Sequence, residues 1–301
     1  MSGSFSVAHE TGAHLAVHID DVEIARYVYM PELPGMESPK PYLHPVRTLG
    51  GAPVSSFRPG DHPWHKGIQM TLSAVSGQNF WGGPSYHDGE YRWLDNIGRV
   101  EHNGFDALDA TPTQVSFVEN LSWVTAGGER WIVERRTVRF HGVDVERGVW
   151  MLDHESELAN VRGAPLVLGS PTTHGRPSAG YSGLFWRGPR SFVGGEIIAA
   201  DGRGGDGAMG SSGPWLAVTA RHDGAGGSAT VLVFAGSSTA AIPLAWFVRS
   251  DPYAAIAPSP SFAAEVVIPE GDAVTLRHRV AVADRAWTRP ALEEFATAHA
   301  L

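Results

Sequence analysis

The sequence predicts an all-β protein: a large antiparallel β-sandwich with one short helix near its C-terminus. Its 301 residues include 36 Gly and 21 Pro, and few long stretches lack both. Such frequent turn formers favour many short strands over long helices. Strand-like runs do not alternate with amphipathic helices, so a parallel sheet is not expected. Because no linker divides the chain, we expect residues 1–301 to form a single domain, a length that large sandwiches reach.

Two hairpins carry the clearest strand signals. Residues 14–19 and 22–29 flank an Asp-Asp turn, and residues 115–124 and 131–140 flank an Ala-Gly-Gly turn. Further strand-like runs cover residues 145–158, 166–169, 215–221, 229–235, 244–249, 262–268 and 274–282.

A strand and a helix can be assigned by their side-chain patterns. From residue 68 onward, Ile68 and Met70 are expected on one face of a strand and Gln69 on the other. The helix is predicted at about residues 289–300, with Thr288 as its cap and Pro290 in its first turn. Its short apolar face consists of Leu292, Phe295 and Ala296.

Composition excludes several classes of protein. A formal net charge of −9 and the lack of any Lys/Arg-rich block argue against a nucleic-acid partner. No run approaches the roughly 20 apolar residues of a membrane helix, and the N-terminus lacks a signal-peptide pattern. We therefore expect a cytoplasmic protein without a membrane partner. With no Cys, any metal would have to bind His and carboxylate ligands, for which the 14 His suffice.

The densest group of functional residue types lies in residues 58–67. His62 is held extended because a proline follows it, and His65 comes three residues later. Two imidazoles on one loop can converge on a ligand, a metal ion or a proton-transfer site. Asp61, Trp64 and Lys66 are candidate substrate-binding residues in the same loop. The alternative is a polar loop whose His and Asp satisfy buried backbone groups.

Four further segments add candidates for substrate binding. Residues 170–187 place a His, two Arg and several aromatic rings among glycines, and an Arg fork suits carboxylates, phosphates or vicinal hydroxyls. Each Arg could equally pair with a neighbouring acid. Residues 78–96 mix aromatic and polar groups as a sugar-binding rim does, although its rings can also serve only to pack the loop. The other two segments are the polar stretches 41–47 and 249–253. The candidates from all four are His44, His87, Arg176, Tyr181, Trp186, Arg187 and Arg249.

Several motifs together resemble a bacterial family labelled "methane oxygenase PmoA". These are Pro41-Tyr42-Leu43-His44-Pro45, Asp61-His62-Pro63-Trp64-His65-Lys66-Gly67, the segment 176–187 and Trp246-Phe247-Val248-Arg249. The resemblance covers nearly the whole chain. The second motif is similar to the family's Asp-His-Pro-His-His-Arg-Gly, with Trp64 in place of the middle His and Lys66 in place of the Arg. A membrane oxygenase subunit needs several long apolar spans, so methane oxidation is not expected.

The layout is more distantly similar to the galactose mutarotase-like (aldose epimerase) superfamily, which is built on a β-supersandwich. The matching positions are His65 (or His62), His174 and Glu265, although Gly175 stands where the superfamily has an aromatic residue. The resemblance implies that one His donates a proton to the sugar ring oxygen while a carboxylate removes one from the anomeric hydroxyl.

Three functions remain open from the sequence. The first is a carbohydrate-acting enzyme, an epimerase, lyase or hydrolase that needs no cofactor, with His62, His65, His174 and Glu265 as catalytic residues. The second is an enzyme with a divalent metal on His62, His65 and a third His. The third is a non-catalytic carbohydrate-binding or partner-binding sandwich. The expected ligand is a small carbohydrate or sugar derivative, and a homodimer is compatible with the long sheet edges of a sandwich.

Overall fold

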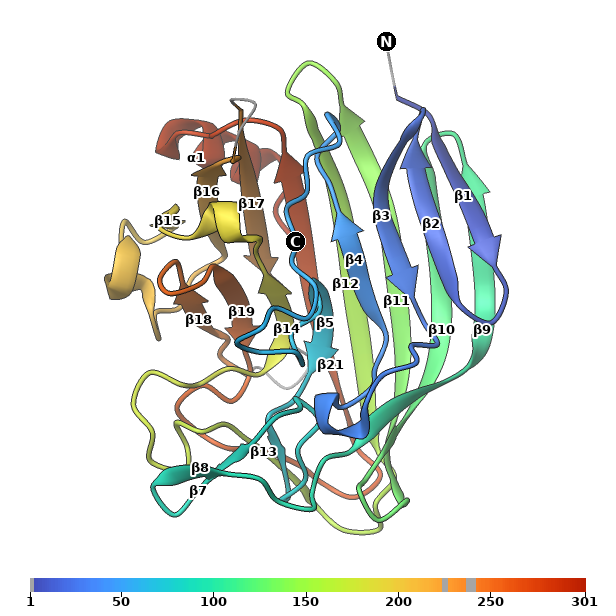
Figure 1. The fold of residues 1–301 in the computed structure, drawn as a ribbon, viewed down its shortest axis with the longest axis vertical. Helices are drawn as coiled ribbons and strands as arrows, with labels where there is room; N and C mark the ends of the chain where they lie inside the picture. The colour runs from blue at the N-terminus through green and yellow to red at the C-terminus, as the bar shows by residue number, and fades with distance from the viewer. Residues whose placement is uncertain (1–2, 224–226, 237–241) are drawn as a thin grey trace.

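The computed structural model of the chain describes residues 3–223, 227–236 and 242–301. It consists mainly of two large antiparallel sheets packed face to face (Figure 1). In spatial order the first sheet consists of β1 (Phe5–Glu10), β2 (His14–Ile19), β3 (Val22–Val28), β4 (Tyr42–Val46), β5 (Ile68–Thr71), β14 (Gly183–Arg187), β19 (Ala255–Ser259) and β18 (Ala245–Arg249). The second consists of β15 (Glu196–Ala199), β16 (Trp215–Arg221), β17 (Ser228–Ala235), β21 (Ala273–Ala283), β12 (Val149–Asn160), β11 (Arg130–Asp144), β10 (Gln114–Val124) and β9 (Arg99–Thr111). The all-β sandwich prediction is confirmed.

Smaller elements surround these sheets. They are the three-stranded sheet β20 (Val266–Ile268), β13 (Leu166–Gly169) and β6 (Ala74–Val75), the hairpin β7 (Ser85–His87) and β8 (Glu90–Arg92), the 3-10 turns η1 (Gly35–Glu37), η2 (Arg190–Phe192) and η3 (Gly205–Ala208), and the helix α1 (Arg289–Ala298).

Side-chain alternation explains why the two sheets pack together. Ile68 and Met70 of β5 are buried in one core cluster with Trp150 and Val280 from the second sheet. Gln69, between them, points the other way and donates to a loop carbonyl. This is the alternation predicted for the strand that begins at residue 68, and it buries apolar surface from both sheets in a shared interior.

The outer face of the first sheet is also apolar over three neighbouring strands. On β14, Trp186 enters the core between the sheets while Phe185 points outward, and on β18 Phe247 points outward as well. These outward rings pack with Trp81 and with Ala257 of β19 in a separate cluster. The strands are covered on both faces here, and this outer face carries the site described below.

The helix lies on the opposite side of the molecule, against the outer face of the second sheet. Its predicted apolar residues Leu292, Phe295 and Ala296 are buried there with Trp215. Thr288 occupies the predicted N-cap position, although its side chain makes no capping hydrogen bond.

The structure changes several sequence assignments. The strand predicted at 145–158 begins only at Val149. The strand predicted at 262–268 begins only at Val266. The segment 78–96, predicted to be irregular, contains the short β7–β8 hairpin. The 13-residue strand β9 was not predicted, because it is a largely exposed edge strand rich in polar residues. Residues 1–2, 224–226 and 237–241 of the predicted domain lie outside the described residues, and the assignment of 1–301 as one domain stays a prediction.

Within the described part of the chain, no helix has the length and apolar character needed to cross a membrane.

Candidate functional site

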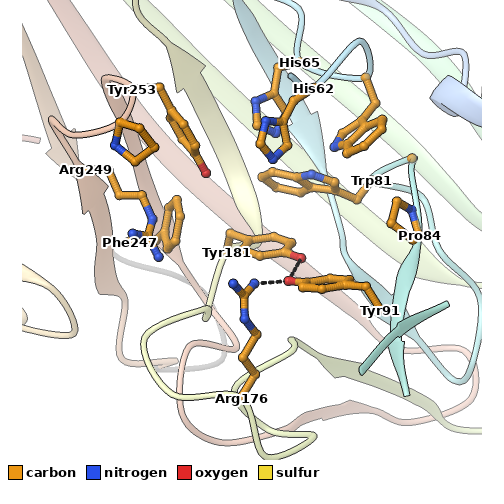
Figure 2. A pocket seen from close by; sticks show the side chains of 13 residues that line it. His62, His65, Trp81, Pro84, Tyr91, Arg176, Tyr181, Phe247, Arg249 and Tyr253 are labelled. Carbon is orange, nitrogen blue, oxygen red and sulfur yellow. Dashed lines mark hydrogen bonds between the residues drawn. The ribbon is translucent and has the colours of Figure 1, made fainter. Parts of the chain in front are cut away.

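A pocket of about 400 Å³ opens on the outer face of the first sheet (Figure 2). Its volume lies in the range of small-molecule sites. The residues that form its walls include His62, Trp64, His65, Trp81, Tyr91, Arg176, Tyr181, Phe247, Arg249 and Tyr253. They come from four parts of the chain that are far apart in sequence: the loop before β5, the segment 81–91, the segment 176–181 and the β18–β19 region.

Backbone hydrogen bonds fix the loop 58–67 beside β14. The amide of Arg187 donates to the carbonyl of Gly67 over 2.7 Å, and Gly67 donates in turn to Ser56 over 2.7 Å. Gly67 has a φ of +55°, and a Cβ there would lie 2.0 Å from the carbonyl oxygen of Leu43. Glycine is therefore required where the loop enters the strand. These backbone hydrogen bonds place the Arg187 side chain directly behind the two histidines of the loop.

Arg187 connects Asp61 and His65. Its Nη2 donates to Asp61 Oδ1 and Oδ2 over 3.1 and 3.0 Å, and its Nη1 lies 2.9 Å from His65 Nδ1. The guanidinium also stacks on the Tyr253 ring, 4.0 Å from its centroid. His62 Nδ1 lies 2.8 Å from Asp61 Oδ2, which completes a chain from His65 through Arg187 and Asp61 to His62.

These partners determine which nitrogen of each imidazole carries a proton. A guanidinium can only donate hydrogen bonds, so His65 Nδ1 accepts and the ring proton lies on Nε2. A carboxylate can only accept, so His62 Nδ1 donates to Asp61 and its Nε2 keeps the lone pair. The two rings stack with centroids 4.6 Å apart and planes 11° from parallel. One imidazole therefore presents an acceptor and its neighbour a donor.

Burial keeps both imidazoles neutral. Desolvation lowers the pKa of His62, and the opposing hydrogen bond to Asp61 does not offset it. Desolvation lowers the pKa of His65 further, and the positive charges of Arg187, Lys66 and Lys40 add to the effect. Burial opposes ionisation of Asp61, but hydrogen bonds from His62 and Arg187 outweigh it and lower the carboxyl pKa.

Beneath the pocket lies a buried cluster around Glu37. Its carboxylate accepts from Arg58 over 2.7 Å and lies 3.2 Å from Lys66 Nζ. Lys40 Nζ donates to the carbonyls of Ser38 over 2.7 Å and Trp81 over 3.1 Å. Desolvation lowers the pKa of Lys66 to about 8 despite the Glu37 carboxylate. This cluster anchors the loop from below.

The opposite side of the pocket is formed by Arg176 and two tyrosines (Figure 2). Arg176 Nη1 donates to the Tyr91 hydroxyl, and its guanidinium lies over the Tyr91 ring at 4.7 Å. The Tyr91 hydroxyl is 2.8 Å from that of Tyr181, whose ring packs on Trp81 at 4.5 Å. Burial raises the pKa of Tyr181 well above its ordinary value.

Part of the predicted site is brought together here. The pocket walls contain His62, Trp64, His65, Arg176, Tyr181 and Arg249, and Asp61 and Arg187 lie directly behind the histidines. The other predicted residues lie outside the walls. His44 forms a hydrogen bond with Ser55 and stacks on Phe57. Lys66 is buried and forms an ion pair with Glu37, and the exposed His87 pairs with Asp88. Trp186 is buried in the core and donates to the carbonyl of Val54.

The predicted pair of His174 and Glu265 is close in space but lies away from this pocket. His174 Nε2 is 3.9 Å from Glu265 Oε1, and both side chains are more than 40% exposed (41% and 48%). Such exposed pairs interact weakly because water screens them. The superfamily assignment of these two residues to catalysis stays a prediction that this arrangement does not support.

The described residues contain no group of three or more His, Asp or Glu side chains placed to hold a metal ion. The hydrogen bonding adds a chemical reason for His65. Its Nδ1 lone pair accepts from Arg187, so a metal on Nε2 would require the ring to lose its remaining proton. His65 as held here suits hydrogen-bond donation better than metal ligation.

Sequence reasoning did not single out Trp81, Phe247 and Tyr253 as site residues. For Phe247 a signal was present, because the run that became β18 is almost continuously apolar. Trp81 and Tyr253 lie in loops, where no such pattern exists. A continuous apolar run indicates a strand covered on both faces, whereas an alternating run indicates one solvated face. Aromatic residues on the second face are candidates for a pocket wall.

Residues 14–297 match the model of a family of unknown function, DUF6807. That family model does not carry the methane oxygenase label, and the resemblance to the family so labelled stays a prediction. No curated protein matches the chain.

Among solved structures, the chain is similar to an alpha-galactosidase from Lactobacillus brevis, with 9% identity and a TM-score of 0.41 over 94% of this chain. It is also similar to the Slr1438 protein from Synechocystis sp. PCC 6803, with 12% identity and a TM-score of 0.40 over 95% of this chain and 98% of that one. A GH36 alpha-galactosidase from Geobacillus stearothermophilus, solved with raffinose, gives 10% identity and a TM-score of 0.36 over 95% of this chain. The chain spans 40% of the length of each alpha-galactosidase chain. These values are too low to carry a function from those proteins to this one.

Proposed function

The chain belongs to the DUF6807 family of unknown function, and we propose that it is a carbohydrate-acting enzyme. In this proposal it is an epimerase or lyase that starts by removing a proton from a carbon next to a carbonyl group of a sugar derivative. The observation that carries the proposal is the pair of stacked imidazoles, which Arg187 and Asp61 hold in complementary states: His62 with a free acceptor and His65 with a free donor.

His62 is the base. Its Nδ1 proton is held by Asp61, which leaves Nε2 to accept the substrate proton and stabilises the imidazolium that forms. Because its pKa is lowered, the ring is neutral and able to accept a proton at physiological pH. A positioned base of this kind contributes about 10²–10⁴-fold to a rate.

His65 is a hydrogen-bond donor to the substrate oxygen. It cannot give up its Nε2 proton, because Nδ1 receives a hydrogen bond from Arg187 and the ring would be left as an imidazolate anion. A neutral imidazole can still stabilise an enolate by donating a hydrogen bond in a buried site. This argues for proton removal from carbon rather than for proton transfer from a histidine to the ring oxygen, which the mutarotase resemblance implied.

The reaction can be written from these two groups. His62 Nε2 takes the proton, the C–H electron pair forms a carbon–carbon double bond, and the carbonyl oxygen becomes an enolate held by His65 Nε2–H. In an epimerase the enolate then turns over in the pocket, and the His62 imidazolium returns the proton to the opposite face of the carbon, which restores neutral His62. In a lyase the carbonyl re-forms and the electron pair of the enolate double bond forms a new double bond between the α- and β-carbons. The β-oxygen leaves with its bonding electrons, and the His62 imidazolium protonates it.

The aromatic walls supply a surface for a sugar. Trp81, Tyr181 and Tyr253 present ring faces or edges around the histidines (Figure 2). Aromatic rings stack on the apolar C–H faces of sugars, while polar groups take the hydroxyls. This lining supports a carbohydrate in preference to a fully apolar ligand.

Solvent exchange tests the proposal directly. Proton NMR in D₂O would follow deuterium incorporation into aldoses and uronates at the carbon next to C1, with the wild-type protein and with His62→Asn. We expect exchange with the wild type and a loss of about 10²-fold or more in the variant. His44→Asn is a matched control, since this half-buried His bonds Ser55 outside the pocket and should leave exchange unchanged.

Two results would count against the proposal. Exchange that persists in His62→Asn would remove the base from the proposal. Sugar binding without any exchange by the wild type would instead favour the non-catalytic carbohydrate-binding alternative.

A further inference from the structure

The pocket is cationic although the whole chain is acidic. No Asp or Glu lines the described pocket, while Arg176 and Arg249 both do. The chain as a whole carries a formal net charge of −9. A positive cleft in a negative protein concentrates anions locally and directs them to one place on the surface.

Arg176 has no carboxylate partner among the described residues. Its recorded contacts are the hydrogen bond to the Tyr91 hydroxyl and the stacking of its guanidinium over the Tyr91 ring. The ring holds the guanidinium plane in place, and most of its five N–H donors remain available to a ligand. Its charge reaches the catalytic side of the pocket, since it contributes to the lowered pKa of His62.

Arg249 is likewise without an ion pair in the described structure. Its Nη2 donates to the carbonyl of Ser178 over 3.3 Å, and its guanidinium lies 5.5 Å from the Phe247 ring. Ser178 is two residues from Arg176, so Arg249 reaches the segment that carries the other arginine. Figure 2 shows both guanidinium groups on the side of the pocket opposite His62 and His65.

The two pocket arginines differ from Arg187 in burial and in charged partners. Arg187 is 5% exposed and its charge is matched by Asp61. Arg176 and Arg249 are half-buried and have no such match in the described residues. A partly desolvated guanidinium without an anion is unfavourable unless a ligand supplies one.

We infer that the ligand of this pocket is a sugar acid, whose carboxylate is held by Arg176 and Arg249 while its carbonyl end faces the two histidines. This rests on the proposed function for the identity of the ligand as a sugar derivative. A six-carbon uronate has this arrangement, with a carboxylate at C6 and an aldehyde-forming carbon at C1. The arginines then set which end of the sugar meets His62.

A carboxylate suits the two arginines better than a phosphate. The planar guanidinium fork matches the two oxygens of a carboxylate in a bidentate pair. Phosphate sites are typically built on backbone N–H groups at a helix N-terminus or in a glycine-rich loop. No helix begins among the described residues that line this pocket, whose walls come from strands and loops.

Matched sugars test the inference. Isothermal titration calorimetry on the full chain would compare D-glucuronate, D-glucose and D-glucose 6-phosphate, and the corresponding galactose series. The three members of each series share one ring and differ at C6. We expect the acid to bind at least about tenfold more tightly than the neutral sugar, and more tightly than the phosphate, at low salt.

Charge-removing variants complete the test. Arg176→Gln and Arg249→Gln should each lower uronate affinity about tenfold or more and leave neutral-sugar affinity within about twofold. Arg176→Lys keeps the charge but not the fork and should fall between. Arg92→Gln is the matched control, because Arg92 is exposed, pairs with Glu90 over 2.7 Å and does not line the pocket.

The outcomes separate this inference from the proposed function. Equal binding of acid and neutral sugar, tighter binding of the phosphate, or an acid preference that survives both glutamine variants would overturn the inference. Deuterium exchange in neutral sugars alone would do the same while leaving the proposed function standing. Uronate binding that depends on both arginines, without exchange by the wild type, would support the inference and reject the enzyme.

Discussion

Two buried arginines, Arg136 on β11 and Arg187 on β14, use their donors in different ways. Arg136 Nε and Nη2 donate to Glu134 over 2.7 and 2.9 Å, and its Nη1 donates to the Tyr27 hydroxyl over 2.9 Å. Tyr27 comes from the first sheet and also contacts Glu119 of the second. All of these side chains are buried between the sheets, so this network joins the two layers of the sandwich.

Arg187 is nearly as buried, but its partners reach a surface. Its Nε has no hydrogen-bond partner, and its other nitrogens contact Asp61 and His65. Asp61 is 46% exposed, and His65 and His62 both line the pocket. The partners of Arg136 form all their hydrogen bonds inside the fold. The network of Arg187, by contrast, leads to His62 and His65, each of which keeps one ring nitrogen free for a ligand. The two guanidinium groups are alike in burial and charge, and what their partners face distinguishes a structural arginine from one that positions a site.

Removing Arg136 should cause the largest loss of stability. In Arg136→Met, Glu134 and Glu119 stay buried without their cation, and we expect the free energy of unfolding to fall by about 3–5 kcal/mol. Urea unfolding measures this. Arg135→Met, at the neighbouring position, is the control. Arg135 is exposed and its Nε lies as far as 3.9 Å from Asp106 Oδ2, so this substitution should change stability by less than about 0.5 kcal/mol. Equal losses in both variants would contradict the structural role.

Changing Asp61 should affect the reaction more than the fold. In Asp61→Asn the amide can donate to His62 Nδ1, which would place the ring proton on Nε2 and remove the free acceptor. We expect deuterium exchange to slow about 10²–10³-fold, and stability to fall as well, because the buried Arg187 guanidinium loses its charged partner. Asp88→Asn is the control, since Asp88 pairs with exposed His87 over 3.0 Å away from the pocket. Unchanged exchange in Asp61→Asn would show that the Asp61–His62 contact does not set the tautomer.

Much of the fold was predictable because its signals are local. Residues 14–19 and 166–169 match the strands β2 and β13, and the apolar face of α1 was located correctly. The strand β9 was not found, because an edge strand with few buried residues lacks the apolar alternation on which the prediction depends.

The site was predictable only in part because its geometry is non-local. The loop with His62 and His65 was identified from residue type and spacing, but Arg187 lies 122 positions from His65 in the chain. Sequence reasoning could name Arg187 as a candidate without knowing that it holds both histidines. His174 and Glu265 show the converse: topological matching brought in residues that are paired in space yet lie outside the pocket.

A subtler change to Arg187 should separate positioning from charge. Lysine keeps the cation but cannot contact both Asp61 and His65 through a rigid fork, so one imidazole loses its orientation. We expect kcat for the exchanging sugar to fall about 10–100-fold, with little change in KM, because the substrate contacts of Arg176 and Arg249 remain. Steady-state kinetics of Arg187→Lys would check the split. A rise in KM at unchanged kcat would instead identify Arg187 as a binding group.

The smallest effect is a pH dependence that distinguishes the two regions through their histidines. His278 faces the core beside His154, and desolvation lowers its pKa from 6.5 to about 4. The unfolded chain therefore binds a proton on this ring at a higher pH than the folded one does. The stability contribution is fully present above pH 6.5 and is lost as the pH falls toward 4. From this ring we expect a decrease of about 1 kcal/mol in the free energy of unfolding between pH 6.5 and 5.5.

Urea unfolding at a series of pH values would measure this decrease, and His278→Gln should flatten it while the exposed His87→Gln should not. Exchange by the folded enzyme should respond to a different ring. Its rate should fall as His62 becomes protonated, below the ordinary histidine pKa, and His278→Gln should leave that profile in place. A shift of the rate profile in His278→Gln would mean that the core and the pocket titrate together, and the distinction drawn between the two buried arginines would then fail.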